Sequence, residues 1–275
     1  MVSNSTMIPI KDNIPTKVFP IISTSIIFVN VLIFLWQRFM YSGTDNSIVY
    51  KSYGLMPHEL TLALTSNHEL LPYNILTIFT SMFLHGGYFH LFGNMLYIWI
   101  FGNNIEDAIG HKKFIIFYFL SGIIAALFQF LYDPQSNIPM IGASGAVSGI
   151  LGAYLILFPY AKVKTVMFIL IFIKVVELPA ILLLSIWFFI QLLFSNGEGI
   201  AWYAHIGGLS SGYFLYDFFG LPFILYQAER KKMFHVKHNL ISHLCMHFLS
   251  IHIYTILQHI TFGLHRLVFY ILEVY

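Results

Sequence analysis

The sequence predicts an all-α protein, a polytopic helical bundle that crosses a membrane several times. Of its 275 residues, 58% are hydrophobic and only 9% are charged, whereas soluble domains carry about 25% charged residues. The mean hydropathy is +0.76, and apolar runs long enough to cross a bilayer recur along the chain. These observations exclude an ordinary soluble domain and make the lipid bilayer an expected partner.

The composition also excludes other classes of protein. The formal net charge is only +2 and no long block of Lys and Arg is present, so we expect no nucleic-acid partner. The single cysteine, Cys245, excludes an internal disulfide framework and a thiolate metal cluster. Residues 1–17 are polar and precede an apolar run without a small-residue cleavage site. They predict a cytoplasmic leader and no signal peptide.

Six membrane spans are expected within residues 18–220. The apolar runs that predict them are 18–36, 89–101, 114–132, 144–159, 180–194 and 200–219. Pro179 suits the start of the fifth span, because proline is favoured in the first turn of a helix. The fourth run is short for a complete span, which would place its first residue, Ser144, below the membrane surface.

Two connections between the spans are predicted to be more than turns. The first, residues 38–84, contains amphipathic pieces, and we expect it to lie on or in the outer interface. The second, residues 163–176, is apolar but contains Lys164 and Lys174. The two lysines favour an interfacial or tilted segment over a span.

The basic residues test this arrangement, because cytoplasmic connections hold the excess of Lys and Arg. They gather before the first span and after the second, fourth and sixth, at Lys11, Lys17, Lys112, Lys113, Lys162, Lys164, Arg230, Lys231 and Lys232. The alternation predicts both termini in the cytoplasm. The starts of the fourth and sixth spans then lie toward the opposite side of the membrane.

The tail, residues 221–275, is apolar and rich in histidine. His243 and His247 have the i, i+4 spacing of a metal-binding pair, but no third ligand is placed beside them. We therefore expect no metal site. The tail is compatible with a seventh span, an interfacial helix or an extension without packed structure.

A serine among small residues marks the start of the fourth span. The stretch 142–149 reads Gly-Ala-Ser-Gly-Ala-Val-Ser-Gly. A serine at the point where a loop becomes a helix can expose its hydroxyl beside free backbone N–H groups, as a nucleophile requires. Serine is also a common helix cap, and small residues are common where membrane helices pack closely. Residues elsewhere must decide between these interpretations.

The sixth span carries a histidine on a face of small residues. His205, Gly208 and Gly212 follow one another at i, i+3 and i+7, and the fourth span has a similar face at Gly145 and Gly149. Such faces let two helices approach closely. Their contact would bring Ser144 within hydrogen-bond reach of His205, which could act as its general base. No Asp or Glu lies within two turns of Ser144 or His205 in either span, so the pair would be a dyad.

The second span supplies further polar groups. His90 and Asn94 lie four residues apart and so share a helix face, and His85 precedes them. Ionisable residues within membrane helices mark functional sites by default. In the six-span arrangement these side chains lie toward the same membrane face as Ser144 and His205. They could donate hydrogen bonds to the oxyanion of an acyl-transfer reaction, together with backbone N–H groups at the start of the fourth span.

These motifs together resemble the rhomboid family of intramembrane serine proteases. The matching stretches are Thr80-Ser81-Met82-Phe83-Leu84-His85, His90-Leu91-Phe92-Gly93-Asn94, residues 102–110 with Glu106 and Asp107, Gly142-Ala143-Ser144-Gly145, and Ala204-His205-Ile206-Gly207-Gly208 with Gly212. The resemblance covers about residues 18–220 and implies a rhomboid-like core of six transmembrane helices. It also implies cleavage of peptide bonds in or near transmembrane segments of other membrane proteins.

The resemblance assigns roles to individual residues. It implies Ser144 as nucleophile and His205 as general base, an oxyanion hole of His90, Asn94 and the Ser144 backbone, and a turn shaped by Gly142. Two features depart from the family pattern. The first connection lacks a Trp-Arg pair, and Ser148 stands where many members have an aromatic residue that packs on the histidine.

Two other functions are compatible with the sequence. A rhomboid-like protein without activity would bind membrane helices, although such proteins usually lack the serine or the histidine. A transporter or proton channel would show inverted repeats, and the chain has no such symmetry. A serine–histidine mechanism requires no cofactor or metal, so none is expected. We expect a multi-pass integral membrane protein in a prokaryotic plasma membrane.

Overall fold

The computed structural model describes residues 7–40, 47–169, 172–193 and 201–218. Its α-helices are α1 (Ile21–Met40), α2 (Ser47–Tyr53), α3 (Pro57–Thr65), α4 (Leu71–Thr80), α5 (Tyr88–Tyr97), α6 (Asn103–Ile109), α7 (His111–Tyr132), α8 (Ser144–Leu157), α9 (Ala180–Leu193) and α10 (Trp202–Phe218). Short helical turns are η1 (His68–Leu70), η2 (Ser81–Phe83) and the π-helical turn η3 (Ile98–Gly102). The strands are β1 (Met7–Asp12), β2 (Lys162–Ile169) and β3 (Phe172–Pro179). The tail at 221–275 lies outside the described residues.

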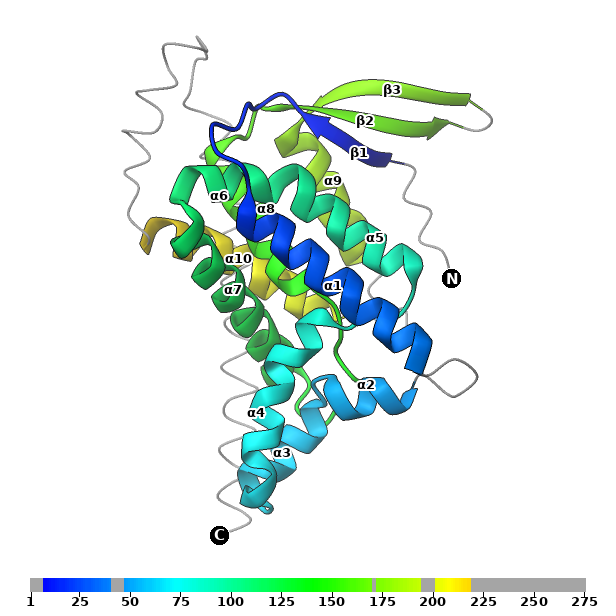
Figure 1. Ribbon diagram of the computed structural model, residues 1–275, viewed down its shortest axis with the longest axis vertical. Coiled ribbons are helices and arrows are strands. Elements are labelled where there is room, and N and C mark those ends of the chain that lie inside the picture. Colours follow the sequence, from blue (N-terminus) through cyan, green and yellow to red (C-terminus); the bar gives the residue numbers. More distant parts are fainter. Residues whose placement is uncertain (1–6, 41–46, 170–171, 194–200, 219–275) are drawn as a thin grey trace.

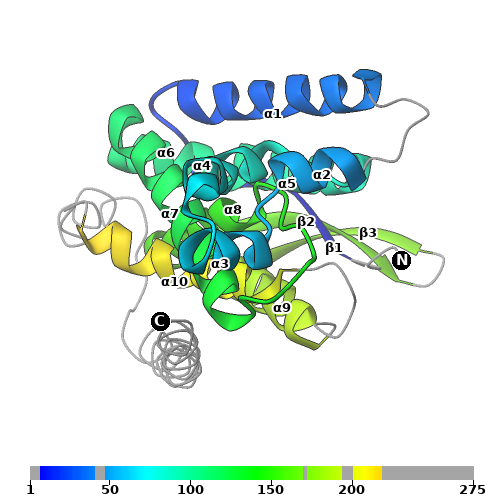
Figure 2. The ribbon, with the colours of Figure 1, turned by 90° about the horizontal axis from the view of Figure 1, so that it is seen from below.

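Helix α8 is the centre of the bundle. All of its residues from Gly145 to Tyr154 are buried, as expected for a helix that is apolar on every side. It packs against α7 and α10, while α1 lies on one flank of the molecule and α9 on the other (Figure 2). The helical membrane bundle predicted from the sequence is confirmed. The prediction that a helix begins at Ser144 is also confirmed.

Glycines let α10 approach α8 at backbone distance. A Cβ atom on Gly208 would lie 2.1 Å from the carbonyl oxygen of Gly145, and one on Gly212 would lie 2.0 Å from that of Gly149. No side chain fits in such a space. The two helices therefore cross with almost nothing between their backbones, which is the close approach that small residues permit in membrane proteins.

The helices differ in how they could cross a membrane. By length and composition, α1 and α7 could each cross a membrane as a single span. The bent pair of segments 68–83 and 88–109 could provide a third span. Helices α8 and α9 are apolar but shorter. The predicted second span continues through η3 and α6 to Ile109, which makes it longer than the apolar run that predicts it.

A three-stranded antiparallel sheet lies at one end of the bundle, far from α3 and α4 (Figure 1). Strand β1 pairs with β2 and β2 pairs with β3. Within the segment predicted to be interfacial or tilted, residues 163–169 and 172–176 belong to two antiparallel strands, and the position of these strands relative to the membrane stays a prediction. Lys162 and Lys164 are exposed while Val163 and Thr165 between them are buried. This alternation with a period of two is typical of a strand packed on one face.

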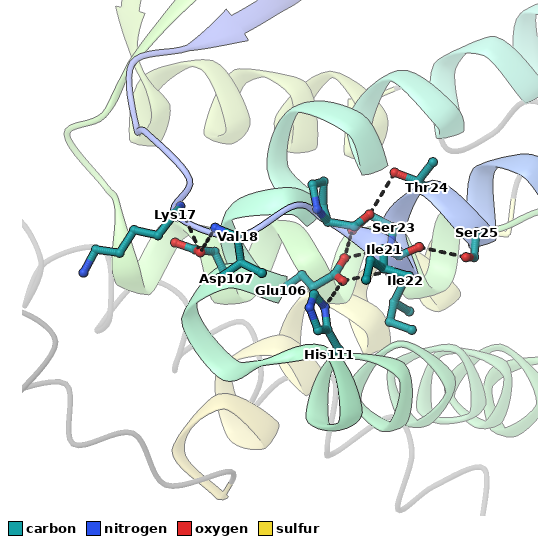
Figure 3. A network of polar contacts seen from close by, with 11 residues as sticks. Lys17, Val18, Ile21, Ile22, Ser23, Thr24, Ser25, Glu106, Asp107 and His111 are labelled. Atoms are coloured by element: carbon teal, nitrogen blue, oxygen red, sulfur yellow. Dashed lines mark hydrogen bonds and ion pairs between the residues drawn. The ribbon is translucent and has the colours of Figure 1, made fainter.

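Carboxylates attach the N-terminal segment to the same end of the bundle. Glu106 is 1% exposed and accepts hydrogen bonds from the backbone N–H groups of Ile22 and Ser23, both at 2.8 Å, and from the Ser23 hydroxyl at 2.7 Å (Figure 3). His111 Nδ1 lies 2.5 Å from Glu106 Oε1, the oxygen that also accepts the Ile22 N–H. Glu106 thus satisfies N–H groups that the first turn of α1 leaves without intrahelical partners.

Strand β1 ends at a second buried carboxylate. Asp12 Oδ2 accepts hydrogen bonds from Tyr154 Oη of α8 and from Asn104 Nδ2 of α6, both at 2.6 Å. Burial raises the pKa of the Asp12 carboxyl, although the hydrogen bonds from Tyr154 and Asn104 act in the opposite direction. The strand is therefore joined to the central helix through a group whose charge depends on pH.

Candidate active site

Ser144 is the first residue of α8 and follows a sharp turn. Gly142 has φ +116°, a conformation that other residues rarely adopt. Its N–H donates to the Ser81 carbonyl oxygen at 2.8 Å, which fixes the turn to η2. Ala143 is buried, whereas Ser144 remains partly exposed. The turn thus presents the hydroxyl of Ser144 at the open end of the buried helix.

His205 of α10 lies directly beside this hydroxyl. Its Nε2 is 2.9 Å from Ser144 Oγ, a hydrogen-bond distance. The histidine is 8% exposed, and its Nδ1 is buried without a hydrogen-bond partner among the described residues. The close packing of α8 on α10 at Gly208 sets this distance, because it fixes the two helix ends relative to each other.

His90 and Asn94 of α5 lie across the turn from α10. A Cβ on Gly142 would be 2.6 Å from His90 Nε2 and 3.7 Å from Asn94 Nδ2, so both nitrogens face this glycine. Asn94 Nδ2 is buried and has no hydrogen-bond partner among the described residues. His90 Nδ1 accepts the N–H of Gly86 at 3.3 Å. In a neutral ring this bond puts the proton on Nε2, which then points as a donor toward the turn.

The arrangement has the parts that acyl transfer requires. It offers a hydroxyl, an imidazole in contact with it, and side-chain donors on the other side of the same turn. Because α8 begins at Ser144, its first N–H groups lack intrahelical partners and can donate as well. Among the described residues, no set of three or more His, Cys, Asp or Glu could hold a metal ion. His243 and His247 lie outside those residues.

Two tryptophans that the sequence analysis did not single out surround the histidine. The centroid of the Trp202 ring lies 6.2 Å from that of His205 at an interplanar angle of 75°, and Trp187 of α9 lies at the same distance at 40°. Ser148 instead turns its hydroxyl back to the carbonyl oxygen of Ser144, at 2.8 Å. The spacing of Trp202 three residues before His205 is the sequence signal that could have revealed this contact.

The first connection is held without a Trp-Arg pair. Gln37 of α1 accepts the His85 N–H at 3.2 Å, and the Tyr50 hydroxyl lies 3.4 Å from the His85 carbonyl oxygen. Leu55 forms an isolated antiparallel bridge with Met140, just before the turn at Gly142. The connection is therefore anchored to both segments that lead into the candidate site.

Comparison with known proteins adds independent information. A family model described as the Rhomboid domain matches residues 72–223. Rhomboid protein 1, mitochondrial, of Saccharomyces cerevisiae is 36% identical over 97 residues, covering 34% of this chain and 28% of the yeast protein. Rhomboid protease GluP of Bacillus subtilis is 32% identical over 145 residues, covering 53% of this chain and 26% of that protein.

A third relative has a different functional description. Inactive RHOMBOID-like protein 8 of Arabidopsis thaliana is 42% identical over 93 residues, covering 34% of this chain and 24% of the plant protein. The chain thus spans about a quarter of the length of these relatives. They come from a yeast, a plant and a bacterium, so a prokaryotic plasma membrane stays a prediction for this multi-pass membrane protein.

Proposed function

Since the chain belongs to the rhomboid family, we propose that it is an intramembrane serine endopeptidase that cleaves peptide bonds in or near transmembrane segments of other membrane proteins. The observation that carries the proposal is the 2.9 Å contact between Ser144 Oγ and His205 Nε2. A hydroxyl is a weak nucleophile at neutral pH, and a neutral imidazole in hydrogen-bond contact can remove its proton as it attacks.

The reaction follows from these contacts. Ser144 Oγ attacks the carbonyl carbon of the peptide bond while its proton passes to His205 Nε2. The same nitrogen then gives the proton to the departing amine, which leaves an acyl-enzyme that water hydrolyses by the same route. Because no carboxylate partner of His205 Nδ1 is found among the described residues, the proton is handled by a dyad.

The negative charge of the tetrahedral intermediate needs donors already in place. Asn94 Nδ2 is a candidate for such a donor, because it is buried and has no hydrogen-bond partner among the described residues. His90 Nε2 faces the same turn, and the backbone N–H of Ser144 lies at the start of α8. Donors held rigidly in a site of low dielectric stabilise charge without first having to reorganise, which is why such positions accelerate acyl transfer.

Replacing the nucleophile tests the proposal. Ser144→Ala should abolish cleavage of a single-span substrate by the purified protein in proteoliposomes, because the attacking oxygen is lost. Ser148→Ala is the matched control, since this serine lies one turn further along α8 and donates only to the Ser144 carbonyl oxygen among the contacts described. It should leave cleavage intact. Unchanged cleavage by the Ser144→Ala variant would refute the assignment.

A second function is a rhomboid-like protein that binds membrane helices without cleaving them. The similarity to a plant relative named as inactive favours it, whereas the contact between Ser144 and His205 favours the protease. A fluorophosphonate probe separates the two, because it reacts covalently only with an activated serine. Labelling of the wild-type protein that is lost in Ser144→Ala supports the protease, and an inert folded protein supports the binding function.

A further inference from the structure

The imidazole of His205 has few polar contacts to orient it. Its Nε2 contacts Ser144, and its Nδ1 has no hydrogen-bond partner among the described residues. Within the described part of the chain, only one hydrogen bond therefore opposes rotation of the ring about its side-chain torsions. The dyad therefore needs packing contacts that keep Nε2 pointed at the hydroxyl.

Trp202 is placed to supply such a contact. It is 7% exposed and lies three residues before His205 on α10, so the backbone of one helix fixes both side chains. The two rings meet at a centroid distance of 6.2 Å and 75°, an edge-to-face arrangement that aromatic rings favour. We expect a bulky ring at this distance to limit how far the imidazole can turn toward it.

The other neighbours of His205 are less suited to this task. Trp187 belongs to α9, a different helix, and it also packs against Tyr97 of α5 at 5.5 Å. Its position therefore depends on how α9 and α5 sit relative to α10. Ser148 directs its hydroxyl to its own helix. Trp202 is the aromatic contact that moves together with the histidine.

We propose that Trp202 is a positioning residue, which holds the His205 imidazole in the orientation that removes the proton from Ser144. The proposal rests on the proposed protease function. Trp202 Nε1 has no hydrogen-bond partner among the described residues, and its ring contacts that of His205 in the site, so we expect its effect to reach the reaction through His205. Its removal should lower the rate of the chemical step and leave substrate affinity nearly unchanged.

Two substitutions separate ring packing from loss of volume. Trp202→Leu removes the aromatic ring, and Trp202→Phe keeps a ring edge in the same direction. Trp99→Leu is the matched control, because Trp99 is 53% exposed and lies in η3. For each variant in proteoliposomes, kcat, KM and the rate constant of fluorophosphonate labelling are measured, with thermal unfolding as a check of folding.

The leucine variant should lose roughly 10- to 100-fold in kcat and in labelling rate, the scale expected for a catalytic group displaced by about 1 Å. Its KM should stay within about twofold of the wild-type value, because ground-state binding is not altered. The phenylalanine variant should recover most of the loss, and Trp99→Leu should match the wild-type protein. Should the leucine variant unfold, Trp202→Met replaces it with the same expectation.

Other results would overturn the inference. Wild-type labelling rates in Trp202→Leu would show that the ring does not orient the histidine. A higher KM with unchanged kcat would assign Trp202 to substrate binding, and equal losses in the leucine and phenylalanine variants would assign it to bulk packing. A wild-type protein that is folded but inert to the probe contradicts the proposed function itself.

Discussion

Gly208→Ala tests whether the close contact between α8 and α10 sets the geometry of the dyad. The new Cβ would lie 2.1 Å from the Gly145 carbonyl oxygen and 2.9 Å from Ser148 Cβ, whereas ordinary contacts begin at 3.4 Å. The nearest obstacle is backbone, which cannot rotate away as a flexible side chain can. The two helices must therefore part by about 1 Å, the scale of misplacement that can cost about a hundredfold in rate.

The cost to stability can be worked from the same contact. Overpacking in a tight interior costs about 1–3 kcal/mol, while replacing glycine by alanine within a helix gains about 0.5–1 kcal/mol. The net loss of unfolding free energy should be about 1–2 kcal/mol. The loss of activity should be larger than this loss of stability implies. Ser144 lies on α8 and His205 on α10, so parting the two helices lengthens the 2.9 Å contact between them.

Gly93→Ala is the control for the change of residue type. Gly93 lies in α5, and a Cβ there would meet nothing within 4 Å, so this variant should be as stable as the wild type or more stable. Both variants are compared by equilibrium unfolding in detergent and by cleavage in proteoliposomes. If Gly208→Ala unfolds like Gly93→Ala and cleaves at the wild-type rate, the close approach of the helices does not govern the site.

Three further substitutions test the carboxylates at the opposite end of the bundle. Glu106→Gln should lower the unfolding free energy by about 1–3 kcal/mol, because an amide cannot accept all the buried donors that the carboxylate accepts. Asp107→Asn should cost less, since Asp107 accepts the N–H groups of Lys17 and Val18 through one oxygen that an amide retains; equal losses would contradict this account. Asp12 has a pKa raised above 3.8, so its contribution to stability is greatest below pH 3.8 and is lost as the pH rises through the raised value. Asp12→Asn should therefore flatten this part of the dependence of the unfolding temperature on pH, and an unchanged profile would show that another group is responsible.

The helices and the start of α8 could be predicted because they depend on local patterns. Apolar runs give the helices, and glycines at regular spacing give the faces that bring α8 and α10 together. The pairing of Ser144 with His205 follows once these faces are in contact. The glycine pattern does not reveal Trp202. Its spacing three residues before His205 is the available signal, but an aromatic residue in an apolar helix usually contributes to packing alone.

The sheet could not be predicted, because β1 pairs with a strand that is distant in the sequence and the adjacent strands β2 and β3 lack an unambiguous strand signal. The alternation from Lys162 to Thr165 is a strand signal, but the apolar residues beyond it equally suit a membrane surface. Strand β1 lies within residues 1–17, whose polar composition indicates a leader and not a strand. No local pattern indicates that Met7 pairs with Met167.

This pairing has a consequence for biosynthesis. Strand β1 leaves the ribosome before α8, whereas β2 is made only after α8 is complete. Until then water must satisfy the backbone groups of β1 that β2 later pairs. Contacts between such distant segments form slowly and late. The pairing of β1 with β2 can therefore form only after the central helix α8 has been synthesised. A chain that ends before Lys162 would lack β2, so β1 would have no partner strand from the native fold.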